Sequence, residues 1–173
     1  NTPITMTYFQ GNTAHPQHFS VGAILINEKG EVCCHRFLTK NLRGYWKDEG
    51  LDDFYILMRE TPNQNESIEQ AVHRGLMEEF GATAELVDYV GSIKSSFVDN
   101  GVAIEKTTVY FLCKLLDQDL SRRSNDDIES TTIVEWQTPE FLIPRMKAQA
   151  EKYGRTDVDE SAILERFLNR KGA

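Results

Sequence analysis

Two adjacent glutamates in the middle of the chain, Glu78 and Glu79, are the residues best placed to do chemistry. Apolar residues around them recur every four positions, which predicts one buried stripe on a helix: Ile68, Val72, Leu76 and Phe80. A helix turns by about 100° per residue, so Gly75, Glu78 and Glu79 should share a face beside that stripe. Two like charges at the edge of a core cost free energy unless a cation neutralises them, which favours a divalent-metal site. The alternative is a solvated helix face on which Arg74 and Glu78 form a weak ion pair.

The distribution of charge is compatible with both interpretations. The 173 residues carry 19 Lys and Arg against 27 Asp and Glu, for a formal net charge of −8. Residues 53–91 alone hold eight acids and two bases, whereas the segments on either side are nearly balanced. Attraction to phosphates dominates the affinity of proteins for nucleic acid, so general nucleic-acid binding is not expected of this acidic chain.

The helix with the glutamates is expected to follow Glu66 and to end at Gly81, a typical C-cap. Strands are expected on both sides of it, at His18–Asn27, Glu31–Leu38, Phe54–Arg59, Ala84–Phe97, Ile104–Leu116 and Thr131–Gln137. The sequence Asp99-Asn100-Gly101 predicts a tight hairpin turn between two of them. A second helix is expected to open at Thr138-Pro139-Glu140, and an amphipathic third one covers about 157–170.

The composition is that of an ordinary globular protein, with 40% hydrophobic and 27% charged residues. We expect one domain over residues 1–173, with a core of about 18–152 and the last helix as an addition. No apolar run approaches the ~20 residues of a membrane helix, so no membrane association is expected. Cys33, Cys34 and Cys113 cannot all pair, and a reducing, cytoplasmic location is the simplest expectation. The oligomeric state is open, with a homodimer as one candidate.

The spacing around the glutamates resembles the signature of the Nudix hydrolases. In that family a glycine is followed after five residues by Glu, and after seven more by Arg-Glu-apolar-x-Glu-Glu-x-Gly-apolar. This chain has matching residues at Glu66, Arg74, Leu76, Glu78, Glu79, Gly81 and Ala82. The resemblance covers roughly 20–146 and implies an α/β fold, namely an α/β/α sandwich with a mixed sheet and a C-terminal helix as an extension.

The resemblance also implies a reaction: hydrolysis of a nucleoside diphosphate linked to another group, with Mg²⁺ or Mn²⁺ as the cofactor. Glu78 and Glu79 would be the metal carboxylates, and Glu66 an auxiliary ligand. Arg74 would hold a glutamate by charge-assisted hydrogen bonds. The substrate would be a small, nucleotide-like molecule, and Trp46 and Tyr55 are candidates for stacking on its base.

Two positions depart from the family pattern. Gly75 stands where the family has a glutamate, and Glu60 stands where it has a glycine. Three consequences are open: weakened hydrolysis, a shifted ligand set in which Glu60 or Glu69 supplies the missing carboxylate, or a nucleotide- or protein-binding regulatory module without turnover. A glycine inside a helix also indicates close approach of a strand or a ligand. The candidates for a general base outside the helix are Asp126, Asp127, Glu129 and Glu135.

Overall fold

A computed structural model describes residues 8–38, 53–124 and 131–171. It contains a 7-stranded mixed sheet. The strands are β1 (Gln17–Ile26), β2 (Val32–Phe37), β3 (Phe54–Ile56), β4 (Met58–Glu60), β5 (Ala82–Asp99), β6 (Val102–Gln118) and β7 (Ile133–Gln137). The helices are α2 (Ile68–Phe80), α3 (Pro139–Tyr153) and α4 (Ser161–Lys171), with short 3₁₀ turns η2 (Leu120–Arg122) and η4 (Thr156–Val158).

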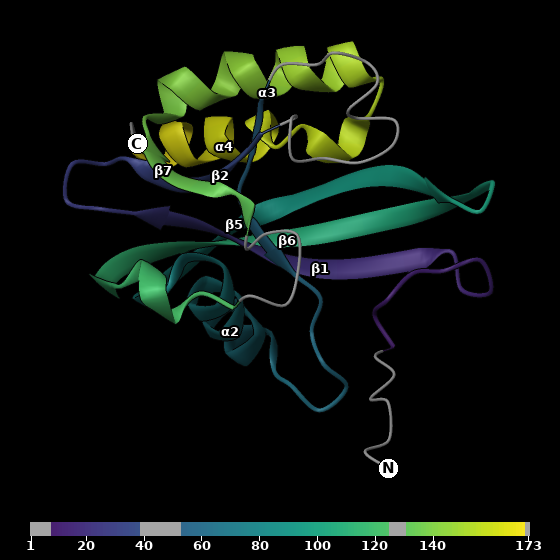
Figure 1. Cartoon of the computed structure of the whole chain (residues 1–173), viewed down its shortest axis with the longest axis horizontal. Coiled ribbons are helices and arrows are strands. Elements are labelled where there is room, and N and C mark those ends of the chain that lie inside the picture. Colours follow the sequence, from purple (N-terminus) through teal and green to yellow (C-terminus); the bar gives the residue numbers. More distant parts are fainter. Residues whose placement is uncertain (1–7, 39–52, 125–130, 172–173) are drawn as a thin grey trace.

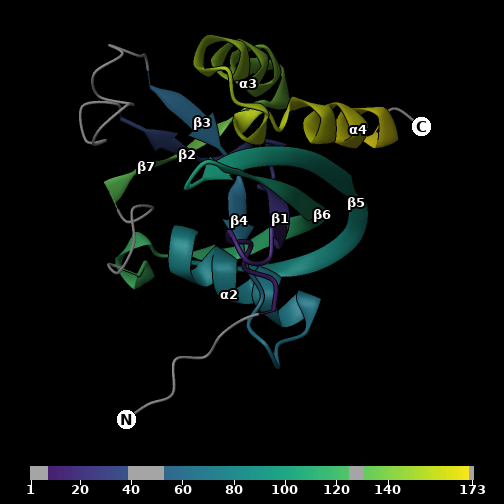
Figure 2. The ribbon, with the colours of Figure 1, turned by 90° about the vertical axis from the view of Figure 1, so that its right-hand side faces the viewer.

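The helices cover both faces of the sheet, with α2 on one side and α3 and α4 on the other (Figures 1 and 2). This arrangement confirms the predicted α/β class and the C-terminal helix. Each face has its own apolar core, because alternate residues of a strand point to opposite sides. Val21 and Ala23 of β1 pack with Leu76 of α2, whereas Ile24 packs with Leu142 of α3. No helix among the described residues has the length and apolar character needed to cross a membrane.

The centre of the sheet is a parallel pair, β1 and β6, whose ten residue partners run from Gln17↔Glu105 to Ile26↔Lys114. The antiparallel neighbour of β6 is β5, so the predicted hairpin is present and is longer at both ends than expected. Its turn has positive φ at Asn100 (48°) and Gly101 (78°), the conformation that an Asn-Gly pair favours.

The expectation of one strand over Phe54–Arg59 was wrong. The segment is divided at Leu57: β3 pairs with β2, and β4 pairs with β1. The division arises because β1 and β2 share only the pair Ile26↔Val32 and then diverge, so the segment passes from one strand to the other. At the break, the Leu57 N–H donates to Glu160 Oε1 at 2.8 Å, which satisfies a backbone group that the ladder no longer reaches.

Helix α2 matches the prediction except at its first residue. Ser67 and Gln70 form a capping box at its start, and Gly81 ends it with φ at 60°. Val72, Leu76 and Phe80 are fully buried, as expected, but Ile68 is 43% exposed. The predicted spacing of apolar residues is correct for the rest of the helix. Ile68 lies in the first turn, beyond the part of the helix that packs on the sheet. Ala71 is instead the first residue buried with the stripe.

The C-terminal helix was expected over about 157–170, and the structure has the turn η4 followed by α4 from Ser161. Buried polar side chains attach this region to the divided strand. The Gln149 amide accepts from Tyr55 N–H (2.9 Å) and donates to Tyr55 O (2.6 Å) and to Val158 O (2.8 Å). The C-terminal helices therefore support the strand segment that leads to β4.

Candidate active site

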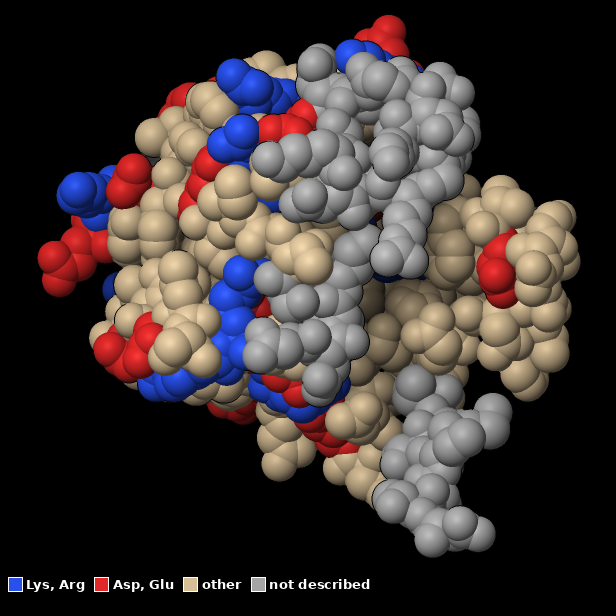
Figure 3. Space-filling model, in the orientation of Figure 1, with Lys and Arg blue, Asp and Glu red and all other residues tan. Residues whose placement is uncertain are grey.

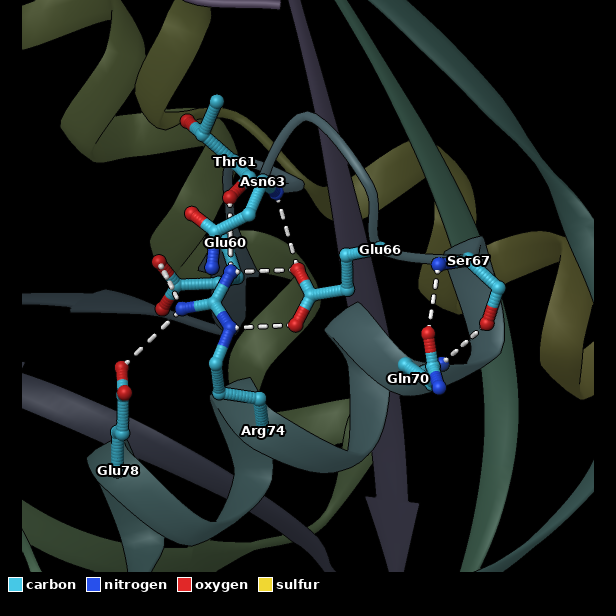
Figure 4. A network of polar contacts seen from close by, with 8 residues as sticks. All are labelled: Glu60, Thr61, Asn63, Glu66, Ser67, Gln70, Arg74 and Glu78. Carbon is cyan, nitrogen blue, oxygen red and sulfur yellow. Dashed lines mark hydrogen bonds and ion pairs between the residues drawn. The ribbon is translucent and has the colours of Figure 1, made fainter. Parts of the chain in front are cut away.

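Arg74 is the centre of a polar network between α2 and the loop before it (Figure 4). Its guanidinium donates to both Glu66 carboxylate oxygens, at 2.7 and 2.9 Å, and to Thr61 O at 2.9 Å. Its Nη1 faces Glu60 Oε1 at 3.2 Å and Glu78 Oε2 at 3.3 Å. The bidentate pair lowers the pKa of Glu66, whose carboxylate also accepts from the Asn63 N–H. Arg74 therefore orients the carboxylates of Glu60 and Glu78. Glu66 binds Arg74 and the Asn63 N–H and so stabilises the loop before α2.

A second glutamate pair lies deeper. The carboxyl groups of Glu60, at the end of β4, and Glu79, on α2, are in hydrogen-bonding contact. Glu79 is only 4% exposed, and burial raises the pKa of Glu60 against the opposing effect of Arg74. Two carboxylates in contact repel each other unless they share a proton or a cation. This pair is therefore the strongest candidate for a cation site in the described part of the chain.

The two departures from the sequence pattern meet at this point. A Cβ atom built on Gly75 would lie 3.1 Å from Glu60 Cβ and 2.6 Å from Met58 Sδ. Strand β4 therefore packs directly against the bare backbone of α2 at this position, as the mid-helix glycine suggested. The space that a side chain at position 75 would need is filled by Met58 and Glu60.

The Glu60–Glu79 pair opens into a cavity of about 120 Å³, here called the polar cavity. Its lining residues are His18, Ser20, Ile56, Arg59, Glu60, Thr61, Glu79 and Lys106. A volume of this size holds several water molecules. The acidic wall comes from β4 and α2. The opposite wall has the cations Arg59 of β4 and Lys106 of β6 beside His18 of β1, so the cavity combines ligands for a cation with groups that attract anions.

His35 lies behind Glu79 and is fully buried. Its Nε2 is 2.7 Å from Glu79 Oε1, and its Nδ1 is 2.6 Å from Thr132 Oγ1. Burial lowers the pKa of His35 to about 3, with Arg123 and Arg59 adding to the effect, so the ring is neutral near pH 7. A neutral ring facing a carboxylate donates from Nε2. His35 thus fixes the orientation of Glu79. The spacing of His35 in the sequence does not indicate this role, because its contact joins β2 to α2 across 44 residues.

Magnesium is compatible with these donors. Among the described residues, no three His, Cys, Asp or Glu side chains form a ready-made metal site. Mg²⁺ commonly takes only one or two protein carboxylates and completes its shell with waters and substrate phosphates. Glu60 and Glu79 supply two such carboxylates in a cavity with room for water. Glu78, whose side chain is 40% exposed, shares Arg74 with Glu60 and lies outside the cavity lining.

The other predicted site residues are not brought to the polar cavity. Glu69 has a side chain that is 71% exposed and faces His73 across 3.9 Å. Glu135 on β7 pairs with Arg36 at 3.0 Å. Tyr55 is buried and lines a separate cavity of about 130 Å³ with Arg145 of α3. Trp46, Asp126, Asp127 and Glu129 lie outside the described residues.

Comparisons with known proteins identify the family and the fold. The family model described as NUDIX domain matches residues 16–156. Among solved structures, a MutT protein from Methanosarcina mazei Go1 is 22% identical, with 91% of this chain and 97% of that chain covered and a TM-score of 0.56. A NUDIX hydrolase from Nitrosomonas europaea is 15% identical, with coverage of 81% and 93% and a TM-score of 0.56.

The E. coli ORF135 protein is 16% identical, with 90% of this chain and 91% of that chain covered and a TM-score of 0.56. At these identities the likeness to solved structures is one of fold. The comparison with curated proteins gave no significant match. Because the family model spans most of the chain, including β1, the polar cavity and α3, the chain belongs to the Nudix family and is a Nudix-type hydrolase.

Proposed function

We propose that this chain hydrolyses a nucleoside-diphosphate-linked small molecule, with Mg²⁺ or Mn²⁺ held by a ligand set in which Glu60 replaces the carboxylate absent at Gly75. The observation that carries the proposal is the contact of Glu79 with Glu60, a residue that packs against the bare backbone of Gly75. A carboxylate on the strand occupies the space that a carboxylate on the helix would otherwise fill. Of the three alternatives that the sequence left open, this arrangement favours the shifted ligand set with Glu60, and it argues against Glu69.

In the proposed site, Glu60 and Glu79 are the inner carboxylates and Glu78 is an outer one. A bound divalent ion would supply charge neutralisation for the diphosphate and an activated water. Arg74 keeps Glu60 and Glu78 near one another, and His35 holds Glu79 in one orientation. These partners reduce the freedom of the carboxylates before any ligand arrives, which is how supporting residues raise the affinity of a metal site.

Two further features support a small, anionic substrate and a reducing compartment. Acidic and basic side chains lie next to one another on the face seen in Figure 3, unlike the broad basic surface of a nucleic-acid binder. The three cysteines are free thiols, which supports the cytoplasmic location.

The test is a panel of nucleoside diphosphate derivatives assayed with Mg²⁺ and with Mn²⁺ for phosphate-containing products. Glu60→Gln should weaken Mn²⁺ binding by about 10- to 100-fold in calorimetry and lower turnover in parallel. Glu69→Gln is the matched control, because it makes the same change at an exposed glutamate of α2 outside the polar cavity, and it should change neither quantity. Metal and nucleotide binding without any product would contradict the hydrolase and favour a binding module. Unchanged Mn²⁺ affinity in Glu60→Gln would contradict the ligand assignment.

A further inference from the structure

Lys106 lies where the two central strands bring distant residues together. His18 of β1 and Lys106 of β6 are direct partners in the parallel ladder, and Ser20 and Thr108 are partners two residues on. Side chains two residues apart share a face of a strand. The Ser20 and Thr108 hydroxyl oxygens are 2.8 Å apart, which places these pairs on one polar strip of the sheet. Strand β4 lies beside β1 (Figure 2) and adds Arg59 to the same cavity.

The carboxylates that act on Lys106 already have other partners. The charged groups nearest Lys106 are the cations Arg59 and Arg155 and the carboxylates of Glu160 and Asp157. Asp157 forms an ion pair with Arg155. Glu160 accepts from the Leu57 N–H and from the Tyr110 hydroxyl and faces the charge of Arg59. Arg59 itself donates from Nη1 to the Asp157 backbone oxygen. Each of these groups therefore has a partner other than Lys106.

The Lys106 ammonium has no hydrogen bond or ion pair to another residue in the described ranges. Burial lowers the pKa of Lys106 to about 7, and the positive charge of Arg59 adds to the effect. This shift is expected of a half-buried ammonium that lacks an anion. An unpaired cation in a cavity costs free energy, and an anionic ligand would remove that cost. The cavity that holds this cation also holds the Glu60–Glu79 pair.

We propose that Lys106 and Arg59 form a phosphate-binding subsite that holds a second, non-reacting phosphoryl group of the substrate, next to the carboxylate end of the polar cavity. The inference rests on the proposed function for the identity of the ligand. The proposed diphosphate already has two phosphoryl groups, and the inference adds the residues that hold the one that is not attacked. Lysine binds phosphate as a point charge, and arginine adds directed N–H donors, so the two side chains suit one tetrahedral oxyanion.

The experiment uses inorganic phosphate as the probe, with EDTA present so that divalent cations play no part. Amide chemical shifts of the whole chain are followed by NMR during the titration. The expected result is a saturable shift at residues of the cavity, such as Ser20, Thr61 and Lys106. Lys106→Met should weaken phosphate binding by about 10-fold or more, because it removes a charge-assisted contact. Lys106→Arg, which keeps the charge, should stay within about 3-fold of the parent.

Lys94→Met is the matched control, since Lys94 lies on the neighbouring strand β5 with a side chain that is 73% exposed. It should bind phosphate like the parent chain. The subsite is overturned if phosphate shifts map elsewhere, for example to Arg145 and Lys152 of α3, or if Lys106→Met binds phosphate as well as the parent. These results do not depend on turnover. Lys106-dependent phosphate binding in a chain that hydrolyses nothing would uphold the subsite and refute the proposed function.

Discussion

The two walls of the polar cavity are built in different ways. The acidic wall comes from adjacent parts of the chain: β4, the loop at 61–67 and α2, joined by Arg74. The basic wall comes from β1, β4 and β6, where the paired residues Ser20 and Thr108 are 88 positions apart. The first wall therefore depends on a helix and its caps, and the second on the register of a parallel ladder. Changes to the sequence should damage the two walls by different routes.

The largest expected effect on stability concerns the packing that carries the acidic wall. Leu76 is fully buried against β1, so Leu76→Ala should lower the free energy of unfolding by about 2–5 kcal/mol, measured by urea denaturation. Ile68→Ala is the matched control, because Ile68 is 43% exposed and its loss should cost less than about 0.5 kcal/mol. Equal losses in the two variants would mean that α2 packs in another orientation.

The contact between Gly75 and β4 should give the next largest effect. Gly75→Ala forces a Cβ against Met58 and Glu60, which should cost about 1–3 kcal/mol of unfolding free energy despite the better helix propensity of alanine. Gly75→Glu should cost at least as much and lower turnover as well, since its carboxyl group crowds Glu60.

The exchange variant Glu60→Gly with Gly75→Glu moves the carboxylate from the strand to the helix. If the two positions share one metal-binding role, the exchange should recover Mn²⁺ affinity lost in Glu60→Gly alone, as followed by calorimetry. Additive losses in the double variant would show that the positions do not substitute for each other.

The sequence predicted the acidic wall better than the basic wall for a physical reason. The stripe of α2, its C-cap at Gly81 and the pairing of Arg74 with a glutamate follow from residues within a few helical turns. His35, Arg59 and Lys106 acquire their roles only when β1, β2, β4 and β6 take their partners, and no local pattern encodes those partners. The division of the strand at Leu57 was missed because it depends on how β1 and β2 diverge.

A smaller effect separates two glutamates that both contact Arg74. Glu66 accepts two hydrogen bonds from the guanidinium and has a side chain that is 13% exposed, whereas Glu78 makes one longer contact and is 40% exposed. Glu66→Gln should therefore cost about 1–2 kcal/mol in urea denaturation with EDTA present. Glu78→Gln should cost less than about 0.5 kcal/mol. The reverse order would mean that Arg74 is held mainly by Glu78.

The smallest effect is a pH dependence on the basic wall. The Gly11 N–H donates to His18 Nδ1 at 2.9 Å, so His18 is neutral and directs its Nε2–H toward Thr61 Oγ1 at 3.3 Å. Burial lowers the pKa of His18 to about 4, and the positive charges of Lys106 and Arg59 add to the effect. Between pH 6.5 and 4 the unfolded chain binds a proton that the folded chain does not, and the free energy of unfolding falls as the pH falls.

His18→Asn keeps an acceptor for the Gly11 N–H and removes this titration. Its stability should therefore lie below that of the parent near pH 7.5, and the gap should narrow as the pH approaches 4. The slopes of unfolding free energy against pH should differ between the two chains by less than ~1.4 kcal/mol per pH unit. That is the limit for one proton bound only by the unfolded chain, and His18 is partly exposed, which reduces the effect. His15→Asn is the control, since His15 is exposed and its replacement should leave the curve unchanged. Parallel curves for His18→Asn and the parent would show that folding leaves the pKa of His18 near its ordinary value of 6.5, and the lowering by burial would be wrong.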